Sequence, residues 1–180
     1  MRTVQQKRSR QRSPARPVDA VQLRQFAVAY VGRYATSSKK LGDYLTRKLA
    51  EKGWSGEGTP DIAAVVEMMA TLGYVDDRAY AEMRSNALVR RGFGASRIRQ
   101  SLYQAGIAED IARPVIDANA HTAYETALAF ARRKRLGPFA VATADARAHQ
   151  RAMAAFVRAG HDFGIARQIL DLNEEFVQDD

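Results

Sequence analysis

The stretch IARPVIDAN, at residues 111–119, recurs as IARQILDLN at residues 165–173. Seven of the nine aligned positions are identical or similar without a gap, and the shared apolar positions have the i, i+4 spacing of one helix face. A related stretch, IAAVVEMM from Ile62, has a similar apolar face. Because a period of roughly 50 residues is typical of stacked helical units, these stretches predict a tandem repeat.

Glycines mark the same place in each unit. Gly53, Gly106 and Gly160 each end a predicted helix ahead of these stretches, at nearly equal spacings along the chain. The first unit has four extra residues, which fit a loop at residues 54–59. We therefore expect an all-α fold, an elongated and curved tandem array of three three-helix, helix-turn-helix-like repeats, because one unit alone is too small to bury much surface. The expected division is a disordered basic tail at 1–18, repeats at 19–74, 75–120 and 121–173, and an acidic end at 174–180.

Polar residues and glycine predict the helix ends of the first repeat. Asp19 and Ser37 are expected N-caps, since their side chains accept hydrogen bonds from the unpaired N–H groups of a first turn. Pro60 fits the first turn of the third helix, where the missing N–H costs nothing, and Gly73 ends that helix.

Charge is distributed unevenly along the chain. The 180 residues carry a formal net charge of +8, but residues 1–18 hold six Lys and Arg residues and no acid. The rest of the chain is therefore nearly neutral at +2, and its last ten residues, DLNEEFVQDD, contain five acids and no base. The basic tail is interpreted either as a solvated, solubilising segment or as a non-specific arm that lies on phosphates or on an acidic protein surface.

Several classes of site are excluded by composition. The chain has no cysteine, and its three histidines, His121, His149 and His161, have no HExxH or i, i+4 partner. No nucleophile–base pair, phosphate-binding loop or clustered set of acids is present. We therefore expect no enzyme activity, catalytic residue, cofactor or metal ion. With no secretory signal and no apolar run of about 18–20 residues, the chain is expected to be cytoplasmic without membrane contact.

The stretch RRGFGASRIRQ, at residues 90–100, is the strongest candidate binding motif. Two glycines, Gly92 and Gly94, are expected to break the helix into a tight turn. It lacks the third glycine, the Lys-Ser/Thr pair and the preceding strand of a nucleotide-binding loop. Arg97 and Arg99 then lie in a first helical turn, where the helix dipole disfavours cations, which suggests an external anion.

Two basic clusters form the candidate binding surface. The alternative for the first cluster is a solvated helix face, and the favourable dipole at a helix C-terminus explains part of the second without a ligand. Tyr103 is expected to pack with Ile98 and Leu102 beneath the first cluster. The candidate DNA- or protein-binding residues are Arg90, Arg91, Arg97, Arg99, Arg132, Arg133, Lys134 and Arg135.

Three further residues are given structural roles. Asp76 and Asp77 precede a predicted helix, and we interpret them as capping residues rather than catalytic carboxylates or metal ligands, because no third acid or histidine lies nearby at ligand spacing. Trp54 is expected to cover the first repeat, with stacking on a single-stranded base as the alternative.

Four stretches resemble one protein family. The runs GYVDDRAYA (residues 73–81) and RRGFGASRIRQSLYQAGI (90–107) closely resemble the signature of the RecX family, bacterial regulators of the RecA recombinase. SSKKLGDYLTRKLAEKG (37–53) and ARRKRLGPF (131–139) are further, less specific matches, and the resemblance covers roughly residues 20–173. It implies tandem three-helix repeats and a non-catalytic regulator that binds the RecA–DNA filament along its groove and damps ATP hydrolysis, strand exchange and repressor cleavage.

The function expected on these grounds is modulation, mainly inhibition, of RecA in DNA repair, recombination and the SOS response. The expected partners are the RecA filament and, non-specifically, single- or double-stranded DNA, with the chain acting as a monomer. A helix-turn-helix transcription regulator is the alternative, since residues 95–104 could enter a major groove. A scaffold with no nucleic-acid contact is a third possibility.

Overall fold

The computed structural model describes residues 17–140 and 145–172, and within these ranges the only regular elements are helices. The predicted all-α class is therefore confirmed. Most of the basic tail and the acidic end at 174–180 lie outside the described residues. The α-helices are α1 (Ala20–Val31), α2 (Ser38–Lys52), α3 (Ile62–Thr71), α4 (Asp77–Arg90), α5 (Ala95–Gln104), α6 (Glu109–Asp117), α7 (Ala123–Lys134), α8 (Ala146–Ala159) and α9 (Phe163–Leu170), with short 3₁₀ turns η1 (Ala120–Thr122) and η2 (Gly137–Phe139).

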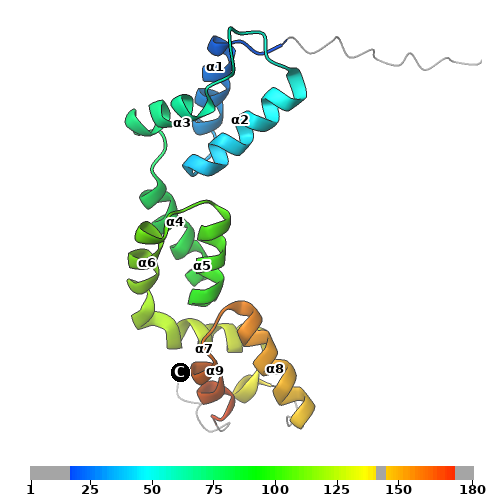
Figure 1. The fold of residues 1–180 in the computed structure, drawn as a ribbon. Coiled ribbons are helices and arrows are strands. Elements are labelled where there is room, and N and C mark those ends of the chain that lie inside the picture. Colours follow the sequence, from blue (N-terminus) through cyan, green and yellow to red (C-terminus); the bar gives the residue numbers. More distant parts are fainter. Residues whose placement is uncertain (1–16, 141–144, 173–180) are drawn as a thin grey trace, which may run out of the picture.

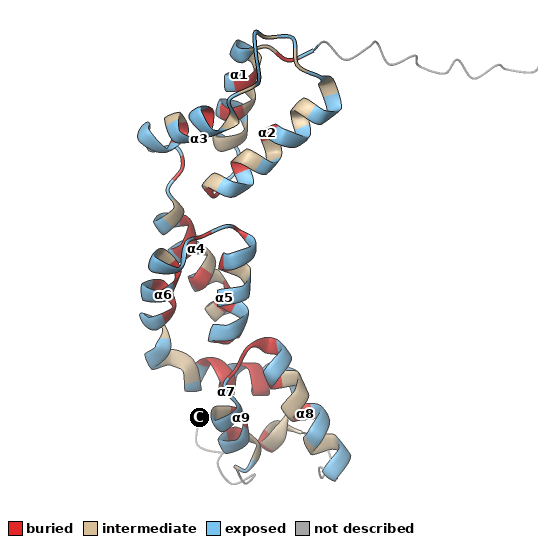
Figure 2. Ribbon diagram, in the orientation of Figure 1, coloured by how far each residue is buried: buried red, intermediate tan, exposed pale blue. Residues whose placement is uncertain are grey.

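The helices form three consecutive groups of three along an elongated, curved array (Figure 1). Each group has its own apolar core, and Figure 2 shows buried positions within each group and exposed positions on its outer surfaces. Representative core residues are Leu41 and Met69 in the first group, Leu102 and Ile116 in the second, and Phe156 and Ile169 in the third. The array of three-helix repeats is as expected from the sequence, whereas the residue boundaries assigned to the repeats stay a prediction.

Both N-caps predicted in the first repeat are confirmed, whereas the predicted position of Pro60 is wrong. The Asp19 carboxylate accepts a hydrogen bond from the Gln22 N–H at 2.8 Å, and the Ser37 hydroxyl accepts one from the Lys40 N–H at 3.3 Å. Pro60, by contrast, lies before α3 rather than in its first turn. Asp61 is the N-cap instead, because its carboxylate accepts the hydrogen bond from the third helical residue, Ala64.

The two aspartates before α4 have different roles. Asp76 is the predicted N-cap, and its carboxylate accepts a hydrogen bond from the Ala79 N–H at 2.9 Å. Asp77 is already inside the helix, and its carboxylate accepts a hydrogen bond from the Ser38 N–H of the preceding repeat at 2.8 Å. Asp77 is therefore not the N-cap of α4, but it lies in the first turn, where a negative charge suits the positive helix end. Its bond to Ser38 ties the second repeat to the start of α2 in the first.

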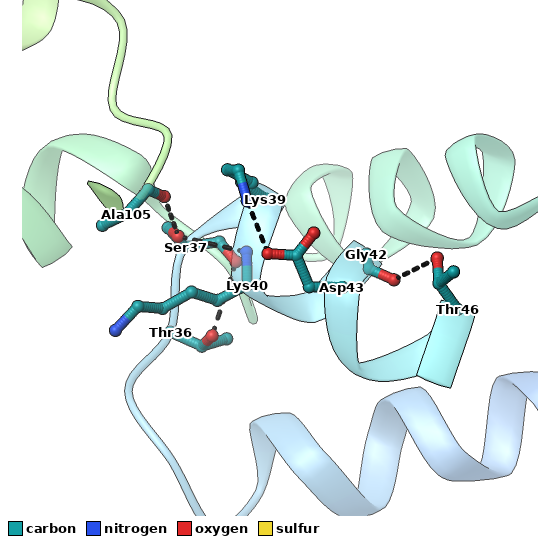
Figure 3. Close-up of polar contacts among 8 residues, drawn as sticks. All are labelled: Thr36, Ser37, Lys39, Lys40, Gly42, Asp43, Thr46 and Ala105. Carbon is teal, nitrogen blue, oxygen red and sulfur yellow. Dashed lines mark hydrogen bonds and ion pairs between the residues drawn. The ribbon is translucent and has the colours of Figure 1, made fainter. Parts of the chain in front are cut away.

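The junction between the first and second repeats is polar (Figure 3). The Ser37 hydroxyl, at the start of α2, donates a hydrogen bond of 2.5 Å to the carbonyl of Ala105, at the end of α5. Lys40 donates to the Tyr80 hydroxyl at 2.7 Å. The backbone at Gly106 packs so closely on Lys39 that a β-carbon there would clash with the lysine side chain. The start of one repeat's second helix thus meets the end of the next repeat's second helix.

The junction between the second and third repeats has the same arrangement, made by backbone. The Gly94 N–H, at the start of α5, donates to the Ala159 carbonyl at 2.9 Å, and the Ser96 N–H donates to the Gly160 carbonyl at 3.1 Å. Gly94 has no side chain to cap α5, so the end of α8 satisfies these N–H groups instead. A β-carbon on Gly94 would clash with the Gly160 carbonyl, and Phe93 packs against the cores of both repeats.

The corresponding end of α2 faces no preceding repeat within the described residues. A β-carbon at Gly53 would meet no atom of this part of the chain within 4 Å. Its backbone is instead paired with the chain ahead of α1: the Val18 N–H donates to the Gly53 carbonyl at 2.9 Å, and the Ser55 N–H donates to the Val18 carbonyl at 2.9 Å. Val18 is fully buried in this position, where it belongs to the first core.

The close contact at Gly94 predicts the effect of a single methyl group. Gly94→Ala should lower the free energy of unfolding by about 1–3 kcal/mol, because the new β-carbon meets backbone that cannot rotate away. Gly94 has a φ of −81°, so no backbone strain contributes. Urea denaturation followed by circular dichroism measures the change.

Gly42→Ala is the matched control for this substitution. Gly42 lies inside α2, and its β-carbon would make an ordinary contact with Val66 at 3.9 Å. This variant should gain about 0.5–1 kcal/mol, because alanine favours a helix interior over glycine. A Gly94→Ala protein as stable as the wild type would show that the α5–α8 contact does not hold the repeats together.

Candidate functional site

The arginines near the Gly92–Gly94 turn surround a hollow between α4 and α5. Its volume is about 120 Å³, and no carboxylate contributes to its lining. The polar residues that line it are Arg84, Arg91, Arg97, Gln100, Ser101 and Gln104. The structure therefore brings together Arg91 and Arg97 of the predicted set, one from each side of the turn. We call these six residues the arginine hollow.

Arg84 belongs to the arginine hollow although it is absent from the predicted binding set. Its Nε donates a hydrogen bond of 2.9 Å to the Ser101 hydroxyl, which ties α4 to α5. Arg84, Leu88 and Arg91 have the i, i+4, i+7 spacing of one helix face. That spacing is the sequence signal that places Arg84 beside Arg91.

Neutral neighbours hold the other two arginines of the hollow. The Arg91 guanidinium lies 5.6 Å from the centroid of the Phe93 ring, and Arg97 Nη1 donates to Gln100 Oε1 at 2.8 Å. Both arginines are exposed, and neither forms an ion pair with a carboxylate in the described part of the chain. Their positive charge is consequently available to an external anion.

The remaining two residues of the first cluster lie elsewhere. Arg99 lines a separate pocket of about 210 Å³ between the second and third repeats, where Asp117 and Asp162 also lie. Arg90 is exposed at the end of α4 and lines neither hollow. The four arginines therefore do not form one site.

The dipole of α5 does not act alone on the arginines near its start. Arg97 and Arg99 lie in the first two turns of α5, whose positive end disfavours them. However, the Ala159 and Gly160 carbonyls at the negative end of α8 meet this helix end directly. Two opposed dipole ends offset each other, so the position of these arginines alone does not require an external anion, contrary to the expectation from the sequence.

The second basic cluster spreads around the end of α7. Arg132 lies 5.3 Å from the Phe139 ring centroid and Arg133 lies 5.9 Å from that of Phe130. The Arg133 guanidinium also approaches the glycine turn, since a β-carbon built on Gly92 would lie 3.2 Å from its Nη2. Lys134 and Arg135 are exposed beyond it. Arg133 is thus the one residue of the second basic cluster that lies close to the glycine turn of the first cluster.

The structure also places two aromatic residues for which the sequence predicts packing roles. Tyr103 is 80% exposed, so the prediction that it packs with Ile98 and Leu102 is wrong: it lies one residue beyond the buried face of α5. Trp54 does cover the first core, as predicted, and its indole N–H donates to the Gly58 carbonyl at 2.9 Å.

His161 is buried at the junction between the second and third repeats. Its Nε2 lies 3.1 Å from the Gly92 carbonyl oxygen, and its ring packs against Phe130 and Phe156, with centroids 5.1 and 5.6 Å away. Burial lowers the pKa of this imidazole from its ordinary value of 6.5, the hydrogen bond to Gly92 raises it, and the Arg133 guanidinium lowers it further. The neutral ring is therefore favoured, and it joins the turn to the third core.

The sequence signal for this burial lies in the repeat itself. His161 follows Gly160 just as Ile107 follows Gly106, and Ile107 is only 5% exposed. A histidine that replaces a core residue of the repeat is expected to be buried. Sequence motifs test His161 only as a possible metal ligand, and the spacing of metal ligands carries no information about burial.

The described residues contain no group of three or more His, Cys, Asp or Glu side chains that could hold a metal ion. Within the same part of the chain, no helix combines the length and apolar character needed to cross a bilayer.

The chemistry that the arginine hollow offers is the binding of an anion through charge-assisted hydrogen bonds.

Comparisons with known proteins give consistent results. A family model described as "RecX, second three-helix domain" matches residues 76–115. The chain is similar to a Regulatory protein RecX of Myxococcus xanthus, with 34% identity over 92% of this chain and 94% of that protein. It is also 37% identical to a Regulatory protein RecX of Acidithiobacillus ferrooxidans, over 51% of this chain and 56% of that one.

A solved structure shows the same fold. The crystal structure of RecX from Lactobacillus salivarius superposes with a TM-score of 0.62 over 84% of this chain and 96% of that chain, at 17% sequence identity. At this identity the likeness concerns the fold alone.

The buried histidine predicts a pH dependence of stability. Because the pKa of His161 is lowered in the folded protein, the unfolded chain takes up a proton first as the pH falls. Neutral His161 contributes its full stabilisation above pH 6.5, the ordinary pKa of the side chain. This stabilisation is lost as the pH falls from 6.5 through the lower pKa that His161 has in the folded protein. The melting temperature of the wild type should therefore fall more steeply between about pH 7.5 and 5 than that of His161→Gln.

His121→Gln is the control for this measurement, because it removes an exposed histidine. It should keep the pH dependence of the wild type. Parallel pH profiles for the wild type and His161→Gln would contradict the assignment.

Proposed function

The chain belongs to the RecX family of regulatory proteins, and from that premise we propose that it binds the RecA–DNA filament and mainly inhibits its recombinase and ATPase activities. It would act in this way in DNA repair, recombination and the SOS response. Its action is binding, without a catalytic step of its own. The observation that carries the proposal is the arginine hollow, where three arginines converge without a carboxylate in the lining.

A nucleoprotein filament offers anions to this surface and is itself an extended partner for an elongated array. Guanidinium groups bind both phosphates and carboxylates in a bidentate manner, so DNA phosphates and acidic protein side chains are both suitable anions. The three second helices, α2, α5 and α8, follow one another along one side of the elongated array (Figure 1). Such an array can contact a filament at several places instead of at one point.

Inhibition follows if binding favours one arrangement of filament subunits. An array that bridges neighbouring subunits stabilises the arrangement that fits it, and shifts the population away from the state that hydrolyses ATP. Arg84, Arg91 and Arg97 would supply the central contacts, with Arg133 beside them across the repeat junction. Arg90, Arg99, Arg132, Lys134 and Arg135 would act as peripheral charges.

The contact at the start of α5 argues against the alternative, a helix-turn-helix transcription regulator. In that class, the N-terminal residues of the recognition helix contact base edges in the major groove. Here the backbone at the start of α5 is covered by Ala159 and Gly160 of the next repeat. Strong protection of one short DNA duplex by the protein alone would nevertheless favour the alternative.

The proposal predicts that two arginines carry much of the inhibition. Replacing Arg91 and Arg97 together by Ala should raise the concentration needed for half-inhibition of RecA ATPase by roughly tenfold or more, because two charge-assisted contacts are lost. The assay measures ATP hydrolysis by RecA filaments on single-stranded DNA over a titration of each variant.

Arg113 and Arg167 provide a control with the same change in charge. Both are exposed but face Asp117 and Asp171, with N–O distances of 3.8 and 3.5 Å. Replacing this pair by Ala should leave inhibition close to that of the wild type. No inhibition by the wild type would refute the function, whereas equal effects of the two double variants would refute the site and leave the function intact.

A further inference from the structure

The first repeat carries another cluster of aromatic and basic residues. A cleft of about 420 Å³ lies between the end of α1 and the middle of α2. Its lining consists of Ala29, Tyr30, Arg33, Tyr34, Tyr44, Arg47 and Lys48, with no acidic residue. The filament-binding surface proposed above uses none of these residues.

Three tyrosines form a row in this cleft. The Tyr30 and Tyr44 rings are stacked, with centroids 4.2 Å apart and planes inclined by 17°. Tyr34 continues the row, with its centroid 5.2 Å from that of Tyr30. Tyr30 and Tyr44 are half-buried against the first core, whereas Tyr34 is 58% exposed. The row is therefore fixed at its inner end and open to solvent at Tyr34.

Three cations border the tyrosine row. The Arg47 guanidinium lies 5.7 Å and the Lys48 ammonium 5.8 Å from the centroid of the Tyr44 ring. Arg33 is exposed on the other side of the cleft and forms no ion pair with a carboxylate in residues 17–140 and 145–172. One acid lies just beyond the cleft: Glu51 accepts a hydrogen bond from Lys48 at 2.7 Å and lies 4.0 Å from Arg47.

We propose that this cleft is a binding site for single-stranded nucleic acid, in which a base stacks on Tyr34 and the adjoining phosphates contact Arg33 and Arg47. Rows of aromatic rings bordered by cations bind single strands in this way, because every base offers a flat face and every nucleotide a negative charge. In a duplex the faces of the bases are already stacked, so a duplex can use only the cations. Asp and Glu side chains can pair with the cations but have no aromatic face to stack on Tyr34.

The test compares oligonucleotides with and without bases. Fluorescence anisotropy measures binding of the chain alone to an oligodeoxythymidine of about twelve nucleotides and to an abasic oligonucleotide of the same length. Tyr34→Ala should weaken binding to oligodeoxythymidine roughly five- to tenfold and leave binding to the abasic strand unchanged. Tyr34→Phe keeps the ring and should bind like the wild type.

Tyr74→Ala is the matched control, because Tyr74 is 59% exposed and lies outside the cleft. It should leave both affinities unchanged. Equal weakening of both oligonucleotides by Tyr34→Ala, no weakening of either, or no binding of oligodeoxythymidine by the wild type would each overturn the proposal.

We expect a second variant to bind nucleic acid more tightly than the wild type. A poorly folded protein could not produce this result. Glu51→Gln removes the carboxylate that holds Lys48 and lies near Arg47, so phosphates meet less competition. This variant should bind both oligonucleotides more tightly, by roughly two- to threefold. Unchanged binding of both would show that these cations do not contact phosphate and would overturn that part of the site.

Oligonucleotide binding is measured without RecA, so this site is tested independently of the proposed function. If Tyr34→Ala weakens binding to oligodeoxythymidine but still inhibits RecA ATPase activity, or the reverse, the nucleic-acid site and the proposed function are separate.

Discussion

The structure depends on one contact, the meeting of the start of one second helix with the end of the next. It occurs at Ser37 against Ala105 and again at Gly94 against Gly160. In both places carbonyl groups from a helix C-terminus meet the N-terminus of another helix, so opposite dipole ends lie together and backbone groups that would otherwise be unpaired are satisfied. The buried helical residues of each core come from a single group of three helices, and Phe93 is the residue that packs against two of the cores, so the cores alone do little to set the direction of the array.

The two junctions use this contact with different chemistry. The first is made by side-chain hydroxyl, carboxylate and ammonium groups, whereas the second adds an apolar bridge through Phe93 and the buried ring of His161. The second junction also fixes the position of the proposed binding surface. Because the Arg97 backbone rests on Gly160 and Arg133 reaches Gly92, the basic side chains around the turn are held by packing rather than by ligands.

Much of this fold could be predicted from the sequence, because a repeat leaves a periodic signal. The constant offset between Ile111 and Ile165, the glycine helix ends and the caps at Asp19 and Ser37 all depend on local or repeated patterns. The errors at Pro60 and Tyr103 concern the exact position of a residue in a local pattern, whereas the other differences concern contacts that no local pattern encodes. Asp77 bonds to Ser38 from another repeat, and the α8 carbonyls that approach Arg97 are distant in the sequence. Whether Arg99 shares a site with Arg91 also depends on tertiary packing.

The pairing of Val18 with Gly53 limits how the array can grow. In a one-dimensional stack, each unit offers one surface to its predecessor and another to its successor, and an uncovered surface invites another unit to join. Gly106 and Gly160 occupy the predecessor-facing position of their repeats, and both are in contact with a neighbour. At Gly53 the equivalent position is already paired with the backbone of Val18. The Gly53 carbonyl is therefore already occupied, so another unit that docked on this carbonyl would first have to displace a buried valine.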